Sequence, residues 1–367
     1  MENRELTVLQ LIVILVSTNI GVGMLAFPRF VALKAETASI SATVFGSMIA
    51  LIGIMSIAYL GKVYDNKTFV GYSREILGEK LGAFFIIIII LFFIIITGLE
   101  LRQFGEVIIG SLLPKTPIYV PMMMIAFICM LASLHSVNVF AYIHLFYIAF
   151  TVAPIIFILL VATTEIDWIY IQPLLGNETT WDGFMTGGFV VTKVLLNFFV
   201  ISMVIPFMRQ PNKAVLASFV GWIIVTILYT LAMFFTLAVF GSTELENLMW
   251  PILVLGRLVR IPAEVFQRLD ALLLVAWMFA VFTTLYSTFY FSVRASTELF
   301  LGFRQRIVAA LLFGIILAIS LLPKDVYEMY EVIKVVSSIG LFLIIGYPLF
   351  LLFIRKVKGS DPINESS

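Results

Sequence analysis

Residues 84–96 read FFIIIIILFFIII, an uninterrupted apolar run inside a longer apolar stretch. A strand of a membrane barrel alternates apolar and polar side chains, so a run of this kind excludes a barrel. A helix needs about 20 mainly apolar residues to cross a bilayer. We therefore predict an all-α integral membrane protein with ten transmembrane helices, at approximately 6–32, 37–60, 82–112, 118–136, 139–161, 184–210, 214–240, 264–294, 305–322 and 332–354.

The composition agrees with this fold class and excludes several functions. Of the 367 residues, 62% are hydrophobic and 12% are charged, against about 45–50% and about 25% in soluble domains. The net charge of +1 provides no basic surface for nucleic acid. One cysteine and two histidines are too few for disulfide frameworks or a zinc site. The sequence has no nucleophile–base pair, phosphate loop or metal cluster, so we expect neither an enzyme nor a bound cofactor.

The distribution of Lys and Arg indicates how the helices are oriented. Ten spans place both termini on one side of the membrane, and cytoplasmic segments retain positive charge. With that side cytoplasmic, thirteen of the 23 basic residues lie in inner segments and seven lie in outer segments. The outer loop between the fifth and sixth spans has no basic residue. We therefore predict that both termini are cytoplasmic.

The first predicted span is interrupted. Residues 18–24 read TNIGVGM, and Pro28 follows. Glycine costs about 1 kcal/mol in a helix interior, and the backbone groups that an interruption frees cannot be satisfied by lipid. Such a break indicates a helix that lines a cavity. The alternative is close packing of helices through small residues.

The sixth predicted span repeats this pattern. Residues 197–203 read NFFVISM, and Pro206 follows. Two broken helices at corresponding places suggest two five-helix halves of opposite orientation, whose breaks meet near the midplane and present free N–H and C=O groups to a small ligand. The two repeats would cover approximately residues 6–161 and 184–354 of a single membrane domain.

These residues resemble those of a known superfamily. The Gly21-Val22-Gly23 break before Pro28 and, loosely, residues 211–213 (PNK) resemble the amino acid–polyamine–organocation transporters. Residues 101–106 (LRQFGE) and 112–117 (LLPKTP) resemble the spore germination permeases, the B subunits of endospore nutrient germinant receptors. The resemblance implies a nutrient-binding subunit in the spore inner membrane, with A-type and C-type partner subunits. The alternative is a secondary amino acid transporter coupled to sodium or protons.

The resemblance also implies where an amino acid or similar small germinant binds. In this fold the N–H groups of the first break receive a carboxylate, and carbonyls of the sixth span receive an ammonium group. Glu100 or hydroxyls of the eighth span could complete the site. The predicted substrate-binding residues are Thr18, Gly21, Val22, Gly23, Glu100, Phe199, Val200, Ser202 and Thr284.

Further charged residues lie in apolar segments, where a charge at a helix centre costs about 2.5–3.5 kcal/mol. Arg102 and Glu106 are four residues apart, so we expect them to pair. Lys193 and Asp270 are predicted at comparable depth, and with Glu100 these residues would form an outer vestibule or gate. The alternative is a set of buried pairs that only hold helices together.

Two further sets of residues are candidates for binding a metal cation or a proton. In sodium-coupled relatives of this fold, a small residue and adjacent hydroxyls of the eighth span bind the ion, and Ala280, Thr283 and Thr284 resemble that arrangement. The alternative is that these hydroxyls bond helix carbonyls. His135 and His144 flank the turn between the fourth and fifth spans. We expect interfacial histidines that bond loop carbonyls, with a proton relay as the alternative.

Overall fold

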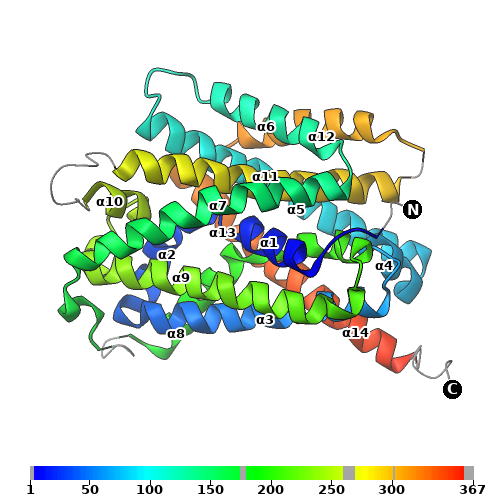
Figure 1. The fold of residues 1–367 in the computed structure, drawn as a ribbon, viewed down its shortest axis with the longest axis horizontal. Helices are drawn as coiled ribbons and strands as arrows, with labels where there is room; N and C mark the ends of the chain where they lie inside the picture. The colour runs from blue at the N-terminus through cyan, green and yellow to red at the C-terminus, as the bar shows by residue number, and fades with distance from the viewer. Residues whose placement is uncertain (1–3, 174–178, 259–268, 301, 359–367) are drawn as a thin grey trace.

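The computed structural model describes residues 4–173, 179–258, 269–300 and 302–358, and it is a multi-pass helical bundle (Figure 1). In these ranges seven helical segments are long and apolar enough to cross a membrane, and three shorter apolar helices accompany them. The long segments are Phe27–Val63, Glu79–Ser111, Val137–Glu165, Trp181–Phe207, Pro211–Leu245, Asp270–Leu299 and Val326–Val357; the shorter ones are Val8–Asn19, Tyr119–Ser133 and Gln305–Ser320.

The helices of the first half follow the predicted segments closely. The prediction missed the short helix α4, whose nine residues cannot cross a bilayer. The elements are α1 (Val8–Asn19), η1 (Val22–Leu25), α2 (Phe27–Ala35), η2 (Glu36–Ala38), α3 (Ser39–Val63), α4 (Phe69–Leu77), α5 (Glu79–Ser111), α6 (Tyr119–Ser133) and α7 (Val137–Val161).

The helices of the second half also follow the predicted segments closely. The prediction missed the short helix α10. Residues 264–268 of the eighth predicted segment lie outside the described residues. The elements are η3 (Ala162–Glu165), η4 (Trp168–Ile171), α8 (Trp181–Val194), η5 (Leu196–Met203), η6 (Ile205–Phe207), η7 (Pro211–Lys213), α9 (Ala214–Leu245), α10 (Pro251–Leu258), α11 (Leu269–Leu299), α12 (Gln305–Ser320), α13 (Val326–Leu341), the π-helical η9 (Phe342–Gly346) and α14 (Tyr347–Val357).

Both predicted interruptions are present, and they differ in form. A capping box between Thr7 and Gln10 starts α1, which ends at Asn19; the chain then passes through the 3₁₀ turn η1 before Pro28 helps to start α2. After α8, by contrast, the chain continues as the 3₁₀ segments η5 and η6 instead of resuming an α-helix. The segment that follows the second break is therefore more tightly wound than an α-helix.

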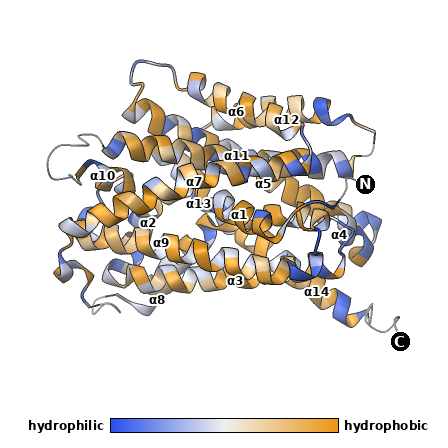
Figure 2. Cartoon of the chain, viewed as in Figure 1, coloured by the Kyte–Doolittle hydropathy of each residue, from blue (hydrophilic) through white to orange (hydrophobic). Residues whose placement is uncertain are grey.

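The bundle buries α1 at its centre. Helix α1 packs against α7, α9 and α11, and η5 also contacts it. Helices α6 and α12 lie side by side along one flank, and the two termini lie at the same end of the bundle (Figure 1). Figure 2 shows hydrophilic residues gathered toward the two ends, with hydrophobic residues between them. This distribution is typical of a protein that crosses a bilayer.

Small residues allow α3 and α8 to cross closely. A Cβ atom added to Gly46 would lie 2.1 Å from the carbonyl oxygen of Gly188. The Thr192 hydroxyl donates a hydrogen bond of 2.9 Å to the carbonyl of Gly46 across the same crossing. Lipid provides no hydrophobic drive for helix association, so close backbone approach and interhelical hydrogen bonds hold this pair.

We predict that Gly46→Leu separates α3 from α8 and lowers the free energy of unfolding by about 2 kcal/mol or more. The matched control is Gly314→Leu on α12, where an added Cβ meets nothing within 4 Å. The measurement is the thermal unfolding midpoint of the purified protein in detergent. Equal stability of the two variants would contradict the close crossing.

Candidate functional site

The break of α1 leaves backbone donors without acceptors. The N–H of Ile20 donates to the Val16 carbonyl (3.1 Å) and that of Met24 to the Gly21 carbonyl (3.2 Å). Between them, the hydrogen bonds of the described residues engage none of the N–H groups of residues 21–23. Three consecutive free N–H groups form a local positive site that suits a carboxylate.

Helix α5 contacts both breaks with one face. Gln103 Nε2 donates to the carbonyl of Val22 in the first break (3.0 Å), and Asn197 Nδ2 of η5 donates to Glu100 Oε1 (2.7 Å). Glu100 and Gln103 are three residues apart and therefore share a helix face. The two breaks are thus joined through neighbouring side chains of α5.

Glu100 keeps one carboxylate oxygen unused. The residue is 9% exposed, and its Oε2 atom has no hydrogen-bond partner among the described residues. A buried carboxylate oxygen without a partner is costly. This atom is therefore a ready acceptor for a cationic group that enters the site.

The last turn of α1 shows a related arrangement. The Tyr229 hydroxyl of α9 donates to the Asn19 carbonyl (2.7 Å), and Asn19 Nδ2 donates to the Leu15 carbonyl (2.8 Å). Asn19 Oδ1 is buried without a partner among the described residues. Carbonyls freed by the break are therefore satisfied by the protein, whereas the acceptor of the Asn19 side chain stays available.

The predicted residues of the sixth span are all buried in η5. The Phe199 ring lies 5.3 Å from the Phe69 ring and 5.7 Å from the Phe291 ring, measured between centroids. Val200 is buried, and Ser202 Oγ has no partner in the described part of the chain. Phe199 thus belongs to an aromatic cluster that fills this part of the bundle.

The space beside the glycines of the break is occupied by other helices. A Cβ atom on Gly21 would lie 1.8 Å from Thr284 Oγ1, and one on Gly23 would lie 2.6 Å from Val194 Cγ1. The cavity next to Gly21 has a volume of about 20 Å³ and apolar walls that include Met24 and Trp277. This volume holds about one water molecule, so an amino acid can bind at the break only after a rearrangement.

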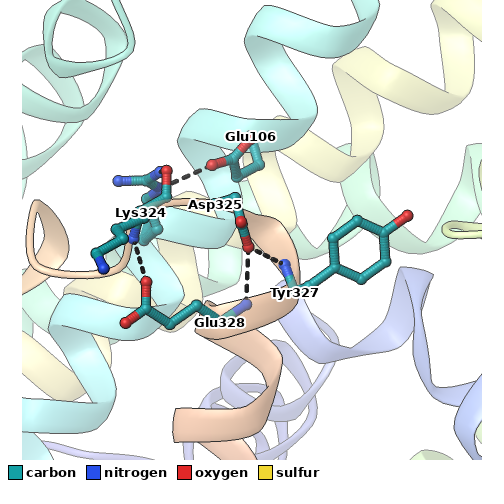
Figure 3. Close-up of polar contacts among 6 residues, drawn as sticks. Glu106, Lys324, Asp325, Tyr327 and Glu328 are labelled. Carbon is teal, nitrogen blue, oxygen red and sulfur yellow. Dashed lines mark hydrogen bonds and ion pairs between the residues drawn. The ribbon is translucent and has the colours of Figure 1, made fainter.

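The pairing of Arg102 with Glu106 is confirmed. Arg102 Nε lies 2.8 Å from Glu106 Oε1, and Arg102 Nη2 donates to the Lys324 carbonyl (3.2 Å) in the turn between α12 and α13. Figure 3 shows Glu106 beside this turn, where Glu328 accepts from the Lys324 N–H and Asp325 caps α13. The pair therefore ties α5 to the start of α13.

The other charges predicted for the vestibule have separate partners. Lys193 Nζ donates to Ser338 Oγ of α13 (2.8 Å), and Asp270 lies 3.9 Å from Arg257 of α10. Glu100 contacts Asn197 instead of Lys193. These contacts link neighbouring helices, and the outer vestibule stays a prediction.

The hydroxyls predicted for a cation site bond carbonyls. Thr283 Oγ1 donates to the Ala280 carbonyl (2.9 Å) and to the Ser17 carbonyl (3.2 Å), and Thr284 Oγ1 donates to the Thr18 carbonyl (3.0 Å). Thr18 Oγ1 lies 2.7 Å from Ser287 Oγ. Thr18 and Thr284 therefore join α1 to α11 directly beside the break.

The expectation for His144 was wrong. Its side chain is fully buried, with Nδ1 at 2.6 Å from Ser17 Oγ and Nε2 at 3.2 Å from Ser287 Oγ. Helix α7 begins at Val137, so His144 lies two turns inside it and faces α1 and α11. His135, by contrast, precedes the helix and is exposed.

Sequence reasoning missed Gln103, Asn197, Ser17 and Ser287 as members of the site. The sequence contains one signal that could have identified Gln103. A polar residue three positions after Glu100 in an apolar helix lies on the same helix face as Glu100. Asn197 lay in the recognised break but had no identifiable partner. The serines resemble residues that bond their own helix, and only the fold brings them to His144.

We predict a strong energetic coupling between Arg102 and Glu106. Glu106→Gln should destabilise the protein more than the double change with Arg102→Gln, because the single change leaves a buried charge unpaired. A double-mutant cycle on unfolding should give a coupling of at least about 1 kcal/mol. The exposed pair Glu331–Lys334 is the control, with an expected coupling below about 0.5 kcal/mol. Additive losses at Arg102 and Glu106 would contradict the pairing.

Comparisons with known proteins place the chain in a family. It is 28% identical to Spore germination protein YndE of Bacillus subtilis (strain 168), over 96% of each chain. It is 25% identical to Spore germination protein B2, over 97% of this chain and 96% of the relative, and 24% identical to Spore germination protein A2, over 96% of each; both are also from Bacillus subtilis (strain 168). The family model described as spore germination protein matches residues 5–329. The chain therefore belongs to the spore germination protein family.

Proposed function

We propose that this protein is the nutrient-binding subunit of a germinant receptor and that its ligand is an amino acid or a similar small zwitterion. The observation that carries this proposal is that, within the described residues, both the N–H groups of residues 21–23 and the Oε2 atom of Glu100 have no hydrogen-bond partner. Helix α5 links the two groups through Gln103 and Glu100. A zwitterion has a carboxylate that can accept from the N–H groups and an ammonium group that can donate to Glu100.

The two ends of the ligand would be recognised differently. The carboxylate would accept from the backbone at residues 21–23, as anions do at helix N-termini. The ammonium group would donate to Glu100 Oε2, with Asn197 holding the other carboxylate oxygen. Thr18, Val200, Ser202 and Thr284 would line the remaining volume once the closed break rearranges.

The helix arrangement supports ten spans in two inverted repeats. Helices α1, η1 and α2 together make one interrupted span, because Glu36 (φ 45°) separates α2 from α3. Helices α6 and α12, with 15 and 16 residues, supply two further spans. The repeats are approximately residues 6–161 and 184–354. Both termini lie at one end (Figure 1), which we assign to the cytoplasm.

The family relationship supports a receptor assembly in the spore inner membrane, with partner subunits of A and C type. Transport of the same ligand, coupled to a proton or sodium, is the second candidate, because the interrupted helices and the closed break suit alternating access. Flux of the identified ligand into proteoliposomes of the purified chain separates the two. We expect ligand binding without flux.

The ligand class can be tested by screening the common amino acids for stabilisation of the purified protein in nanodiscs. For an amino acid that raises the unfolding midpoint, its decarboxylated amine tests the N–H groups of the break, and its deaminated acid tests Glu100. We expect both analogues to bind at least about tenfold more weakly, because each loses one charge-assisted contact. If the amine bound as tightly as the amino acid, the ligand carboxylate would not contact the N–H groups of the break. If the acid bound as tightly, the ligand ammonium group would not contact Glu100.

We predict that Glu100→Gln weakens binding of that amino acid by about 10–100-fold, because the charge-assisted bond to the ammonium group is lost while the shape is kept. The midpoint without ligand should change little, and Glu100→Asp should retain part of the affinity. The control is Glu298→Gln, at a half-buried carboxylate that accepts from Thr68 Oγ1 (2.6 Å). Unchanged affinity in Glu100→Gln would make Glu100 structural.

A further inference from the structure

An apolar cavity of about 20 Å³ lies beside the break of α1. Its walls come from the break and from three other helices: Gly21 and Met24 of the break, Ile155 of α7, Ile252 of α10, and Trp277 and Ala280 of α11. Among the described residues that line it, none carries a charge or a hydroxyl group. A ligand group that enters this space therefore meets apolar side chains and the backbone of the break.

The position of the cavity distinguishes it from a packing defect. Protein interiors pack closely, and an unfilled space lowers stability because the surrounding atoms lose contacts. The cavity adjoins Gly21, whose N–H group is one of those that have no acceptor among the described residues and that we assign to the ligand carboxylate. A ligand held there by its carboxylate would bring its side chain close to the cavity.

Trp277 connects the cavity to the helix that carries Glu100. Its ring stacks on the ring of Phe104 of α5, with the centroids 6.0 Å apart and an interplanar angle of 26°. Phe104 follows Glu100 by four residues, so both side chains lie on the same face of α5. The wall that Trp277 forms therefore lies between the cavity and the face of α5 that we assign to the ligand ammonium group.

Trp277 can move without breaking a hydrogen bond. The residue is 3% exposed, and its Nε1 atom has no hydrogen-bond partner among the described residues. A buried indole N–H usually has an acceptor, as in Trp222, whose Nε1 donates to the Ser47 carbonyl (2.9 Å). Packing, including the stacking on Phe104, thus holds the Trp277 ring, and its displacement is less costly than that of Trp222.

We propose that this cavity receives the side chain of the ligand and that Trp277 limits the size of that side chain. The inference rests on the proposed amino acid site, and it adds that the ligand has a small, uncharged aliphatic side chain. The cavity holds about one water molecule, so a side chain of about one or two carbon atoms fits before Trp277 has to move. A charged or hydroxyl-bearing side chain would be buried there without a hydrogen-bond partner.

The first test compares the affinities of glycine, alanine, 2-aminobutyrate, serine and leucine for the purified protein in nanodiscs, by calorimetric titration. Serine differs from 2-aminobutyrate by a hydroxyl in place of a methyl group. We expect 2-aminobutyrate to bind at least about tenfold more tightly than serine and than leucine, and alanine to bind more tightly than glycine. Glycine has the zwitterion without a side chain, so its binding tests the proposed amino acid site separately.

The outcomes distinguish the two proposals. If glycine binds and serine or leucine binds as tightly as 2-aminobutyrate, the amino acid site stands and the side-chain cavity is overturned. If none of the five compounds binds, both proposals are overturned.

The second test changes the cavity in both directions. Ala280→Val fills it, and we expect affinity for 2-aminobutyrate to fall at least about tenfold while that for glycine changes by less than about threefold. Trp277→Phe shortens the wall and keeps an aromatic ring on Phe104, and we expect affinity for leucine to rise at least about tenfold.

The matched control is Ala276→Val, at an equally buried alanine of α11 that does not line the cavity. It should leave the order of affinities unchanged, and glycine binding by each variant shows that the variant is folded. Equal losses for glycine and 2-aminobutyrate in Ala280→Val, or unchanged affinity for leucine in Trp277→Phe, would overturn the proposal.

Discussion

A helix that is interrupted inside a bilayer must have its freed backbone groups satisfied by the protein, and the interruption of α1 imposes this requirement on its neighbours. Four side chains meet it. Gln103 of α5, Tyr229 of α9 and two threonines of α11 donate to the carbonyls of Val22, Asn19, Ser17 and Thr18. The packing of α5, α9 and α11 around α1 therefore serves hydrogen bonding as well as burial.

Among the described residues, the freed carbonyls of α1 have hydrogen-bond partners, but the freed N–H groups do not. The four donors serve carbonyls of α1, whereas the N–H groups of residues 21–23 engage no acceptor in the described part of the chain. The break consequently favours an anionic group, and Glu100 on the adjoining face of α5 favours a cationic one. Thr284 and Val194 close the space beside the two glycines, so binding of the proposed ligand at the break would require α1 to move relative to α8 and α11. The receptor function that we propose needs a coupling of this kind between ligand binding and helix movement.

The sequence was sufficient for the helical fold and for both interruptions, because the apolar runs and the glycine and proline signals are local. The Arg102–Glu106 pair was predictable for the same reason, since helix geometry fixes an i, i+4 contact. Contacts between residues far apart in the sequence were not predictable in this way. Asn197 was expected to lie in a break, but nothing in the sequence pairs it with Glu100. His144 was placed at the membrane interface because it lies near a span end, and only the packing of α7 on α1 and α11 reveals its serine contacts.

The most direct measurement is a cryo-electron microscopy structure of the protein in nanodiscs with a stabilising amino acid bound. We predict that the ligand carboxylate lies within hydrogen-bond distance of the N–H groups of residues 21–23 and that its ammonium group contacts Glu100 Oε2. We also predict that Thr284 and Val194 have moved away from the glycines of the break. A ligand bound elsewhere, with the break still closed as in the present structure, would contradict the account.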